Sequence, residues 1–234
     1  MAELIEPVVP PNGTLLEVGV GEATTLCGVL SELGGKVKKS FGFDISWSRI
    51  KVANDWLTEK SQQSELFVAD LFHIPLADNS IDVVYSSHSL EPNGGHEEQL
   101  VAECLRVARK SVVLVEPIYE LASIEAQARM EHHGYIRGLR EVAEAFDCTI
   151  EDYRLLEYVV NTLNPSSVLK INKTGYQSDA GEVSNQASWQ CPLTGSPLVK
   201  KSEYFISKGT GIVYPILSGV PLLRSEHSVV ASLI

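Results

Sequence analysis

Residues 15–25, LLEVGVGEATT, place an apolar run directly before two glycines that stand one residue apart. The run 15–18 predicts a buried strand, and the residues after Gly21 favour a helix. Glycine adopts backbone conformations that other residues avoid, and it lets another group approach the main chain closely. The stretch therefore predicts a strand that turns tightly into a helix, with a carboxylate, Glu17, just before the turn.

Strand-like and helix-like segments alternate along most of the chain. The strands expected from the apolar pattern are 14–18, 38–43, 66–69, 81–86, 111–116, 149–160 and 167–172, and the expected helices are 23–33, 46–59, 96–108 and 135–146. This alternation is typical of a parallel sheet with helices on both faces. The predicted fold class is therefore α/β, a Rossmann-like, seven-stranded, mostly parallel doubly wound sheet with a small C-terminal β-rich module.

The composition divides the chain into three parts. Residues 1–172 carry the α/β pattern, whereas residues 173–188 are polar and rich in Gly, Ser and Asn, which is linker composition. Residues 189–234 regain aromatic and β-branched residues between Pro and Gly. We therefore expect an α/β domain, a linker and a small β module.

The negative charge is concentrated in the larger part. Residues 1–160 carry 13 Lys and Arg against 26 Asp and Glu, and residues 161–234 carry 6 against 4. An acidic surface is a poor partner for nucleic acid or an anionic membrane. The N-terminus lacks the pattern of a signal peptide, and no apolar run reaches the roughly 20 residues of a membrane span. With four scattered cysteines and no C-x-x-C pair, we expect a cytoplasmic protein, monomer or homodimer, with reduced thiols.

Two further strands are expected to end at acidic residues. Asp44 follows the second strand and Asp70 the third. Ligands of open parallel sheets bind beyond the carboxyl ends of the strands, where Asp44 is suited to the two hydroxyls of a ribose and Asp70 to an adenine amine. Simpler interpretations remain open: Asp44 as a cap for the helix at Ser46, Asp70 as a loop acid, and the glycine pair as a turn without a ligand.

Four segments, LLEVGVGEATT, FGFDIS, VADLFHIPLADNSIDVVYSSHSLEP and ECLRVARKSVVLVEP, together resemble the class I S-adenosylmethionine-dependent methyltransferases. The resemblance implies the cofactor S-adenosyl-L-methionine, bound over the glycine turn. These methyltransferases usually have a third glycine in the turn, where this chain has Ala23. We expect alanine still to let the helix approach the ligand there. The residues that the resemblance implies for cofactor binding are Glu17, Gly19, Gly21, Thr24, Asp44, Ile45, Asp70, Leu71, Ser86 and Ser87. An NAD-binding pattern is disfavoured, because Thr24 would replace its third glycine.

Methyl transfer to oxygen or nitrogen leaves a proton that a histidine or a carboxylate can take. The catalytic candidates are His88, Glu91, Glu116, His132 and His133. His88 is preferred because it follows the fourth predicted strand, although it also fits a hydrogen-bonded loop histidine. The candidates for substrate binding are Tyr119, Tyr135, Arg137 and Arg140. The two arginines suit a phosphate or carboxylate on the acceptor, unless they belong to a solvated helix start.

Residues 189–224 are similar to the small zinc-ribbon-like activator proteins that partner methyltransferases. The matching segments include CPLTGSPL, YFIS and GVPLL. A zinc ribbon needs four soft ligands, yet Thr194 stands where a knuckle would place its second cysteine, and no cysteine follows Cys191. The sequence predicts no metal site. We expect the module to cover an apolar face or to shape the acceptor site, with a stabilising appendage as the alternative.

The sequence as a whole favours an S-adenosylmethionine-dependent methyltransferase with a small-molecule acceptor. Its similarity to methyltransferases of bacterial surface-glycan and natural-product pathways favours a sugar, a sugar nucleotide or a similar polar molecule. Two other hypotheses stay open. One is a methyltransferase for tRNA or a translation protein that docks on the C-terminal module, and the other is a non-catalytic protein that binds the cofactor or a partner.

Overall fold

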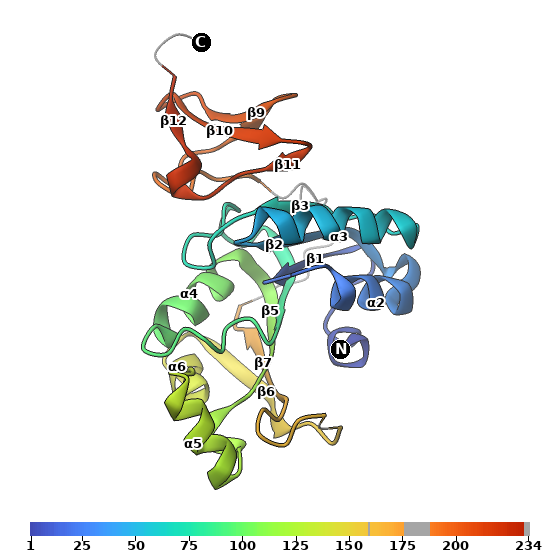
Figure 1. Ribbon diagram of the computed structural model, residues 1–234, viewed down its shortest axis with the longest axis vertical. Coiled ribbons are helices and arrows are strands. Elements are labelled where there is room, and N and C mark those ends of the chain that lie inside the picture. Colours follow the sequence, from blue (N-terminus) through green and yellow to red (C-terminus); the bar gives the residue numbers. More distant parts are fainter. Residues whose placement is uncertain (159, 176–187, 232–234) are drawn as a thin grey trace.

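The computed structural model describes residues 1–158, 160–175 and 188–231. Its main sheet has the strand order β3-β2-β1-β4-β5-β7-β6, in which β7 is antiparallel to both of its neighbours and the other pairings are parallel (Figure 1). The seven strands are β1 (Gly13–Val18), β2 (Val37–Asp44), β3 (Glu65–Val68), β4 (Ile81–Ser87), β5 (Ala108–Glu116), β6 (Cys148–Leu155) and β7 (Ser167–Lys173). The predicted seven-stranded, mostly parallel sheet is confirmed.

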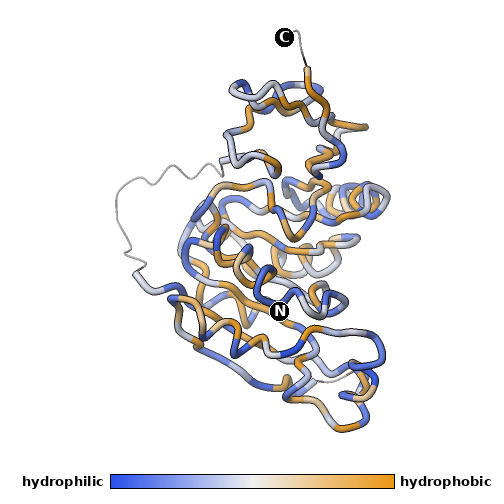
Figure 2. The backbone as a smooth tube through the Cα atoms, turned by 90° about the vertical axis from the view of Figure 1, so that its left-hand side faces the viewer, coloured by the Kyte–Doolittle hydropathy of each residue, from blue (hydrophilic) through white to orange (hydrophobic). Residues whose placement is uncertain are grey.

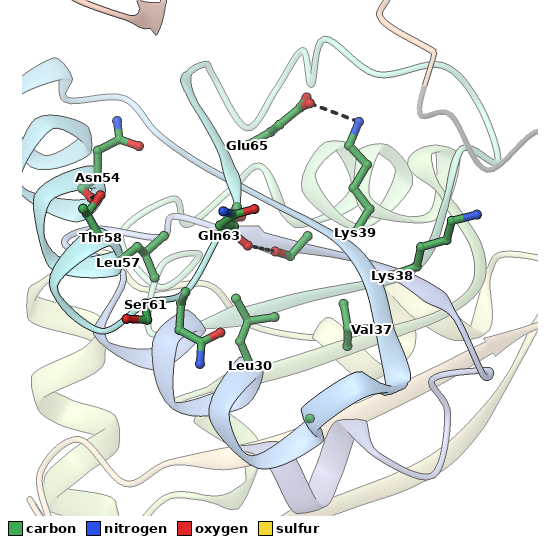
Figure 3. Close-up of a pocket in the computed structure, with 14 residues that line it drawn as sticks. Leu30, Val37, Lys38, Lys39, Asn54, Leu57, Thr58, Ser61, Gln63 and Glu65 are labelled. Carbon is green, nitrogen blue, oxygen red and sulfur yellow. Dashed lines mark hydrogen bonds and ion pairs between the residues drawn. The ribbon is translucent and has the colours of Figure 1, made fainter.

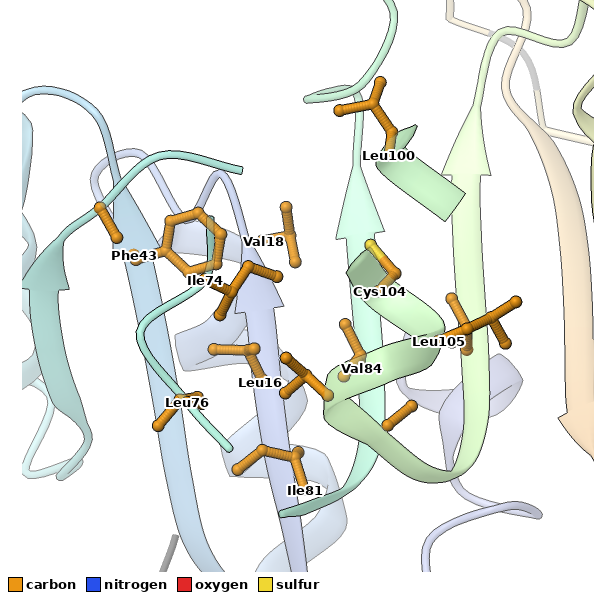
Figure 4. Close-up of a cluster of buried hydrophobic side chains, with 14 of the residues drawn as sticks. Leu16, Val18, Phe43, Ile74, Leu76, Ile81, Val84, Leu100, Cys104 and Leu105 are labelled. Carbon is orange, nitrogen blue, oxygen red and sulfur yellow. The ribbon is translucent and has the colours of Figure 1, made fainter. Parts of the chain in front are cut away.

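Helices cover both faces of this sheet. The α-helices are α1 (Ala2–Ile5), α2 (Thr24–Leu33), α3 (Trp47–Glu59), α4 (Glu97–Val107), α5 (Ile124–His132) and α6 (Leu139–Glu144). Neighbouring strand residues point to opposite faces, and Leu15 and Leu16 are both fully buried. Leu15 packs in the cluster that includes α2 and α3, and Leu16 in the cluster that includes α4 and α6. Figure 4 shows the second cluster, with Leu16 and Val84 facing Leu100 and Cys104 of α4.

The structure differs from the predicted elements in three places. Residues 124–132 form α5, which the sequence pattern did not indicate. The predicted helix 135–146 starts only at Leu139, because Gly138 (φ +63°) has a left-handed backbone conformation that no α-helix contains. The predicted strand 149–160 ends at Leu155.

The C-terminal module is a small antiparallel sheet beside the edge strand β3 (Figure 1). It contains β8 (Val199–Lys200), β9 (Tyr204–Ser207), β10 (Ile212–Leu217), β11 (Val220–Pro221) and β12 (Val229–Val230). Figure 2 shows the module stacked on the end of the α/β part, with hydrophobic residues along the strands. Phe205 and Tyr214 belong to the same buried cluster as Leu16 of β1, so the two parts share a core. Most of the predicted linker, residues 176–187, lies outside the described residues.

The order of the strands creates a switch point at β1. From β1 the chain moves outward through β2 and β3, then crosses back to β4 on the other side. The connections after β1 and β4 therefore diverge and leave space above the carboxyl ends of these strands.

Candidate functional site

A cavity of about 500 Å³ lies at the carboxyl ends of β1 to β4. Of the predicted cofactor residues, Glu17, Gly19, Gly21, Thr24, Asp44, Ile45, Asp70, Leu71 and Ser87 line it. Of the predicted catalytic residues, His88 lines it. The structure thus brings residues from four separate strand ends to one cavity, as the strand-end argument predicts.

The turn after β1 depends on left-handed backbone. Gly19 has φ +67°, and a Cβ atom there would stand 2.3 Å from Cβ of Ser89. Gly21 has φ +55°, and a Cβ atom there would stand 2.6 Å from Nη2 of Arg49. Ala23 is also left-handed, with φ +60°, and it caps α2. Ala23 stands where the methyltransferases that this sequence resembles usually have a glycine, and the left-handed backbone explains why glycine suits this position. The sequence alone did not indicate this.

Asp44 ends β2 beneath this turn and is almost fully buried. Its Oδ2 accepts a hydrogen bond from the Gly21 N–H (3.2 Å), and its Oδ1 accepts one from the Ser46 N–H (2.9 Å). Ser46 itself caps α3 through its side chain. Asp44 therefore ties the glycine turn to the start of α3 and presents its carboxylate to the cavity.

Arg49 is a cavity residue that the sequence analysis did not find. Its guanidinium donates two hydrogen bonds to Glu22, both of 2.9 Å, and its Nη1 lies 3.5 Å from Oδ2 of Asp44. The hydrogen bonds from Arg49 lower the pKa of the Glu22 carboxyl. The only sequence signal was a cation in the first turn of the helix that follows Asp44.

Asp70 begins the loop after β3 and organises its own backbone. Its Oδ1 accepts a hydrogen bond from the Phe72 N–H (3.0 Å), and its carbonyl accepts one from the His73 N–H. Leu71 and Phe72 line the cavity beside it. This arrangement offers a carboxylate and two apolar side chains to one end of a ligand, which is the combination that a heteroaromatic ring requires.

Glu17 occupies the buried floor of the cavity. Its Oε2 accepts a hydrogen bond of 2.8 Å from the Tyr85 hydroxyl. Burial raises the pKa of the Glu17 carboxyl to about 8. The floor of the cavity is therefore formed by a polar side chain that burial disfavours in its charged form.

His88 directly follows β4 and is held on both ring nitrogens. Its Nδ1 lies 3.2 Å from Oε2 of Glu91, and its Nε2 lies 2.7 Å from Oγ of Ser166. The residue has φ +52°, and its N–H donates to the carbonyl of Val115. The hydrogen bond with Glu91 raises the pKa of the His88 imidazole.

Three more side chains extend this network behind His88. Asn164, in the β6–β7 connection, places Nδ2 at 3.4 Å from Nδ1 of His88. Arg129 of α5 donates from Nη1 to Oδ1 of Asn164 (3.1 Å) and to the Tyr135 hydroxyl (3.3 Å), and this hydroxyl donates to Oε1 of Glu91 (3.4 Å). Sequence reasoning named His88, Glu91 and Tyr135 and missed Arg129, Asn164 and Ser166, which lie far away in the chain.

Glu116 and Ser86 differ from their expected roles. Glu116 is fully buried and faces away from the cavity. It accepts hydrogen bonds from the Ser86 hydroxyl (2.7 Å) and from the N–H groups of Ser89 and Leu90 (3.1 and 3.2 Å). Burial raises the pKa of this carboxyl. Both side chains therefore hold the connection after β4, where His88 lies, and leave the lining of the cavity to Ser87.

The expected anion-binding arginines are already paired with carboxylates. Arg137 lies 3.4 Å from Glu131 and 4.6 Å from the ring centre of Tyr119, whose hydroxyl donates to Glu131. Arg140 pairs with Glu144 at 2.9 Å and lies over Tyr153. Neither arginine lines the cavity, and their role in binding a phosphate or carboxylate stays a prediction.

His132 and His133 are exposed at the end of α5. Their rings contact each other at 5.2 Å between centres, and neither residue lines the cavity. This position corrects the expectation that they are placed to serve as the base.

A larger cavity, of about 710 Å³, opens at the amino ends of β2 and β3. Its lining includes the first residues of β2 and the segment that leads into β3, with Lys39 paired to Glu65 and Lys38 pointing outward (Figure 3). Ligands of parallel sheets bind at the carboxyl ends of the strands, and none of the predicted site residues lies here. We therefore place the functional site at the smaller cavity.

In the C-terminal module, Cys191 is buried and its Sγ lies 3.3 Å from the Tyr214 hydroxyl. Within the described ranges, no three His, Cys, Asp or Glu side chains gather as a metal site would require. We predict that the purified protein contains no stoichiometric zinc and that a chelator leaves its unfolding temperature unchanged. One zinc per chain by elemental analysis would contradict this prediction.

We compared the chain with known protein families, sequences and structures. Residues 16–115 match the family model described as a methyltransferase domain, and no curated protein sequence matches the chain. A putative sarcosine dimethylglycine methyltransferase from Galdieria sulphuraria is similar in structure, with a TM-score of 0.60, 12% identity, and coverage of 74% of this chain and 83% of that one.

Two further structures have the same fold. Magnesium protoporphyrin IX methyltransferase (ChlM) from Synechocystis PCC 6803 with bound SAM has a TM-score of 0.55 at 13% identity, with 73% of this chain and 74% of that one covered. The [4+2]-cyclase SpnF has a TM-score of 0.58 at 15% identity, with 74% and 79% covered. The cyclase shows that this fold also carries other chemistry. In the described part of our chain, no helix has the length and apolar character of a membrane span.

Proposed function

We propose that this chain is an S-adenosylmethionine-dependent methyltransferase. The observation that carries the proposal is the convergence of the glycine turn, Asp44 and Asp70 on one cavity from three successive strand ends. The methyltransferase-domain match over residues 16–115 spans these same strand ends. When bound, the cofactor supplies an activated methyl group on a sulfonium that leaves as a neutral thioether.

Different residues of the cavity would bind different parts of the cofactor. Asp44 is positioned to accept hydrogen bonds from ribose hydroxyls, and Asp70 with Leu71 and Phe72 frames the adenine. The glycine turn lets the ligand approach bare backbone. Glu17 and Ser87 lie toward the methionine end. Holding both reactants in line accounts for much of the rate, since orientation contributes about 7–11 kcal/mol in favourable cases.

His88 is the residue that we assign to the proton of the acceptor. The Nδ1–H of a neutral ring would be donated to Glu91, so Nε2 is the ring nitrogen that carries a lone pair. The Ser166 hydroxyl lies 2.7 Å from Nε2, and the acceptor would take the place of this hydroxyl. An acceptor hydroxyl or amine would give its proton to this side of the ring as it takes the methyl group.

The acceptor that we propose is a small polar molecule, such as a sugar, a sugar nucleotide or a natural-product intermediate. Arg137 and Arg140, the candidates for an anionic group on the acceptor, are paired with carboxylates and do not line the cavity. Glu91 and His88 offer hydrogen-bond acceptors to a polar group of the acceptor. Nucleic acid is a poor candidate, because the α/β part is strongly acidic.

Asp44 provides a direct test of the cofactor assignment. Asp44→Ala should weaken the binding of S-adenosylhomocysteine by about 1.5–3 kcal/mol, because hydrogen bonds from ribose hydroxyls to a charged carboxylate are lost. Calorimetric titration measures this change. The control is Asp55→Ala, which removes an exposed carboxylate from α3 that does not line the cavity. Equal affinity in the two variants would refute the ribose assignment.

A further inference from the structure

The C-terminal module contacts the α/β part next to the two residues that would hold the adenosine. On one side of Asp70, the Leu223 N–H donates to the carbonyl of Val68 (2.8 Å), and Leu222 pairs with Val68 as a parallel bridge. Val68 is the last residue of β3 and precedes Asp70 by two positions. The module therefore extends the edge of the main sheet at the end of β3, where the loop that carries Asp70 begins.

The other side of the same loop is also fixed by the module. The Gln190 N–H donates to the carbonyl of Pro75 (3.0 Å), and the Ala77 N–H donates to the carbonyl of Ser188 (2.8 Å). Between these bonds, Leu76 and Trp189 form a bridge. The loop that carries Asp70, Leu71 and Phe72 is thus held at both of its ends by backbone of residues 188–223.

Aromatic side chains connect the module to the wall of the cavity. Trp189 lies edge-on between Phe205 and Phe67, each with its ring centre 5.1 Å away. Phe67 stacks on Phe43 at 5.6 Å, and Phe43 lines the cavity. A shift of the module is therefore transmitted through packed rings to the cavity, since dense cores do not absorb such displacements locally.

A fourth contact lies beside Asp44. The indole Nε1 of Trp47 donates to the carbonyl of Leu217 in β10 at 3.3 Å. Trp47 is the first residue of α3, three positions after Asp44. By contrast, the hydrogen bonds of Glu91 and Ser166 described above go to His88, and that of Arg129 goes to Asn164, so this network does not involve the module.

We propose that the C-terminal module is a positioning element for the adenosine half of the cofactor, and that its docking on β3 sets the cofactor affinity. The inference rests on the proposed function and extends it. It differs from the expectation that the module covers an apolar face or shapes the acceptor site, because it assigns the module to the cofactor. Because coupling between sites is reciprocal, a bound cofactor must stabilise the docked module by the same factor.

Two variants test the proposal with S-adenosylhomocysteine as the probe. Trp189→Leu removes the ring between Phe205 and Phe67, and we expect binding to weaken about tenfold, within the range usual for coupled sites. Trp47→Phe deletes only the N–H donor, and we expect a smaller loss of about threefold. The control is Trp56→Phe on the same helix, because the indole nitrogen of Trp56 has no hydrogen-bond partner.

Hydrogen exchange provides a second measurement that does not depend on a variant. Adding S-adenosylhomocysteine to the unmodified protein should slow amide exchange at Leu222, Leu223 and Gln190 as well as in the cavity. In steady-state assays the two variants should raise KM for the cofactor and leave kcat at saturation nearly unchanged.

The outcomes distinguish a failure of the positioning role from a failure of the proposed function. Folded Trp189→Leu and Trp47→Phe proteins with unchanged affinity, or protection confined to residues 17–25, 43–49 and 69–73, would overturn the positioning role. If Trp189→Leu does not fold, Trp47→Phe and the exchange data decide. Failure of the unmodified protein to bind S-adenosylhomocysteine would instead remove the proposed function itself, and this inference with it.

Discussion

Gly19→Val should abolish detectable binding of S-adenosylhomocysteine while the protein still folds. The backbone of Gly19 has φ +67°, and a Cβ atom would stand 2.3 Å from Cβ of Ser89. A β-branched residue cannot adopt this conformation without strain of about 1–3 kcal/mol. Relief of the contact must also displace Ser89, whose hydroxyl donates to the carbonyl of Val18. The turn would then move away from the position in which a ligand meets bare backbone.

The matched control is Gly28→Ala in α2. A Cβ atom at Gly28 meets no heavy atom within 4 Å, and alanine is favoured over glycine in a helix by about 1 kcal/mol. This variant should bind the ligand normally and unfold at a slightly higher temperature. Titration calorimetry and thermal unfolding of both proteins provide the comparison. Normal binding by Gly19→Val would show that the turn does not contact the ligand.

His88→Gln should lower kcat by a factor of about 10²–10⁴, which is the usual contribution of a general base. The amide keeps a similar size and some of the hydrogen bonds to Glu91 and Ser166, but it cannot take a proton. Binding of S-adenosylhomocysteine should stay within a few-fold of the unmodified protein. His133→Gln is the control, because His133 is exposed at the end of α5. A near-normal rate for His88→Gln with its true acceptor would make His88 a loop histidine.

The same assignment predicts the direction of the pH profile. A base must be neutral, and the hydrogen bond that the His88 imidazole donates to Glu91 raises the pKa of His88. The rate should therefore rise with pH through a midpoint above the ordinary value for histidine, which is about 6.5. Glu91→Gln removes the carboxylate, so it should move the midpoint to lower pH. An unchanged midpoint would exclude His88 as the titrating group.

Local sequence patterns predicted the sheet and located most of the residues that line the cavity at its strand ends. Each of these residues lies within a few positions of a strand end, so the apolar run that predicts the strand also locates the side chain, as for Asp44 and Asp70. Gly19 and Gly21 carry their own conformational signal. The family resemblance added roles for these positions, and the structure places nearly all of them around one cavity.

The acceptor side could not be predicted in the same way. Ser166 and Asn164 reach His88 only because β7 inserts next to β5 in the antiparallel direction, and no local pattern reveals that pairing. Glu116 ends a strand as Asp44 does, but N–H groups of the connection after β4 surround its carboxylate. Arg137 and Arg140 look like a basic patch in the sequence, whereas Arg137 pairs with Glu131 of α5 and Arg140 pairs with Glu144 of its own helix.

The position of the C-terminal module also matters for self-association. β3 is the edge of the main sheet, and an uncovered edge strand offers its backbone to other chains. Here Leu223 pairs with Val68, and Trp189 covers Phe41 and Phe67, both fully buried. Without these contacts, an open strand edge and two large aromatic side chains would face solvent together. By covering this edge, the module should also limit edge-to-edge aggregation of the protein.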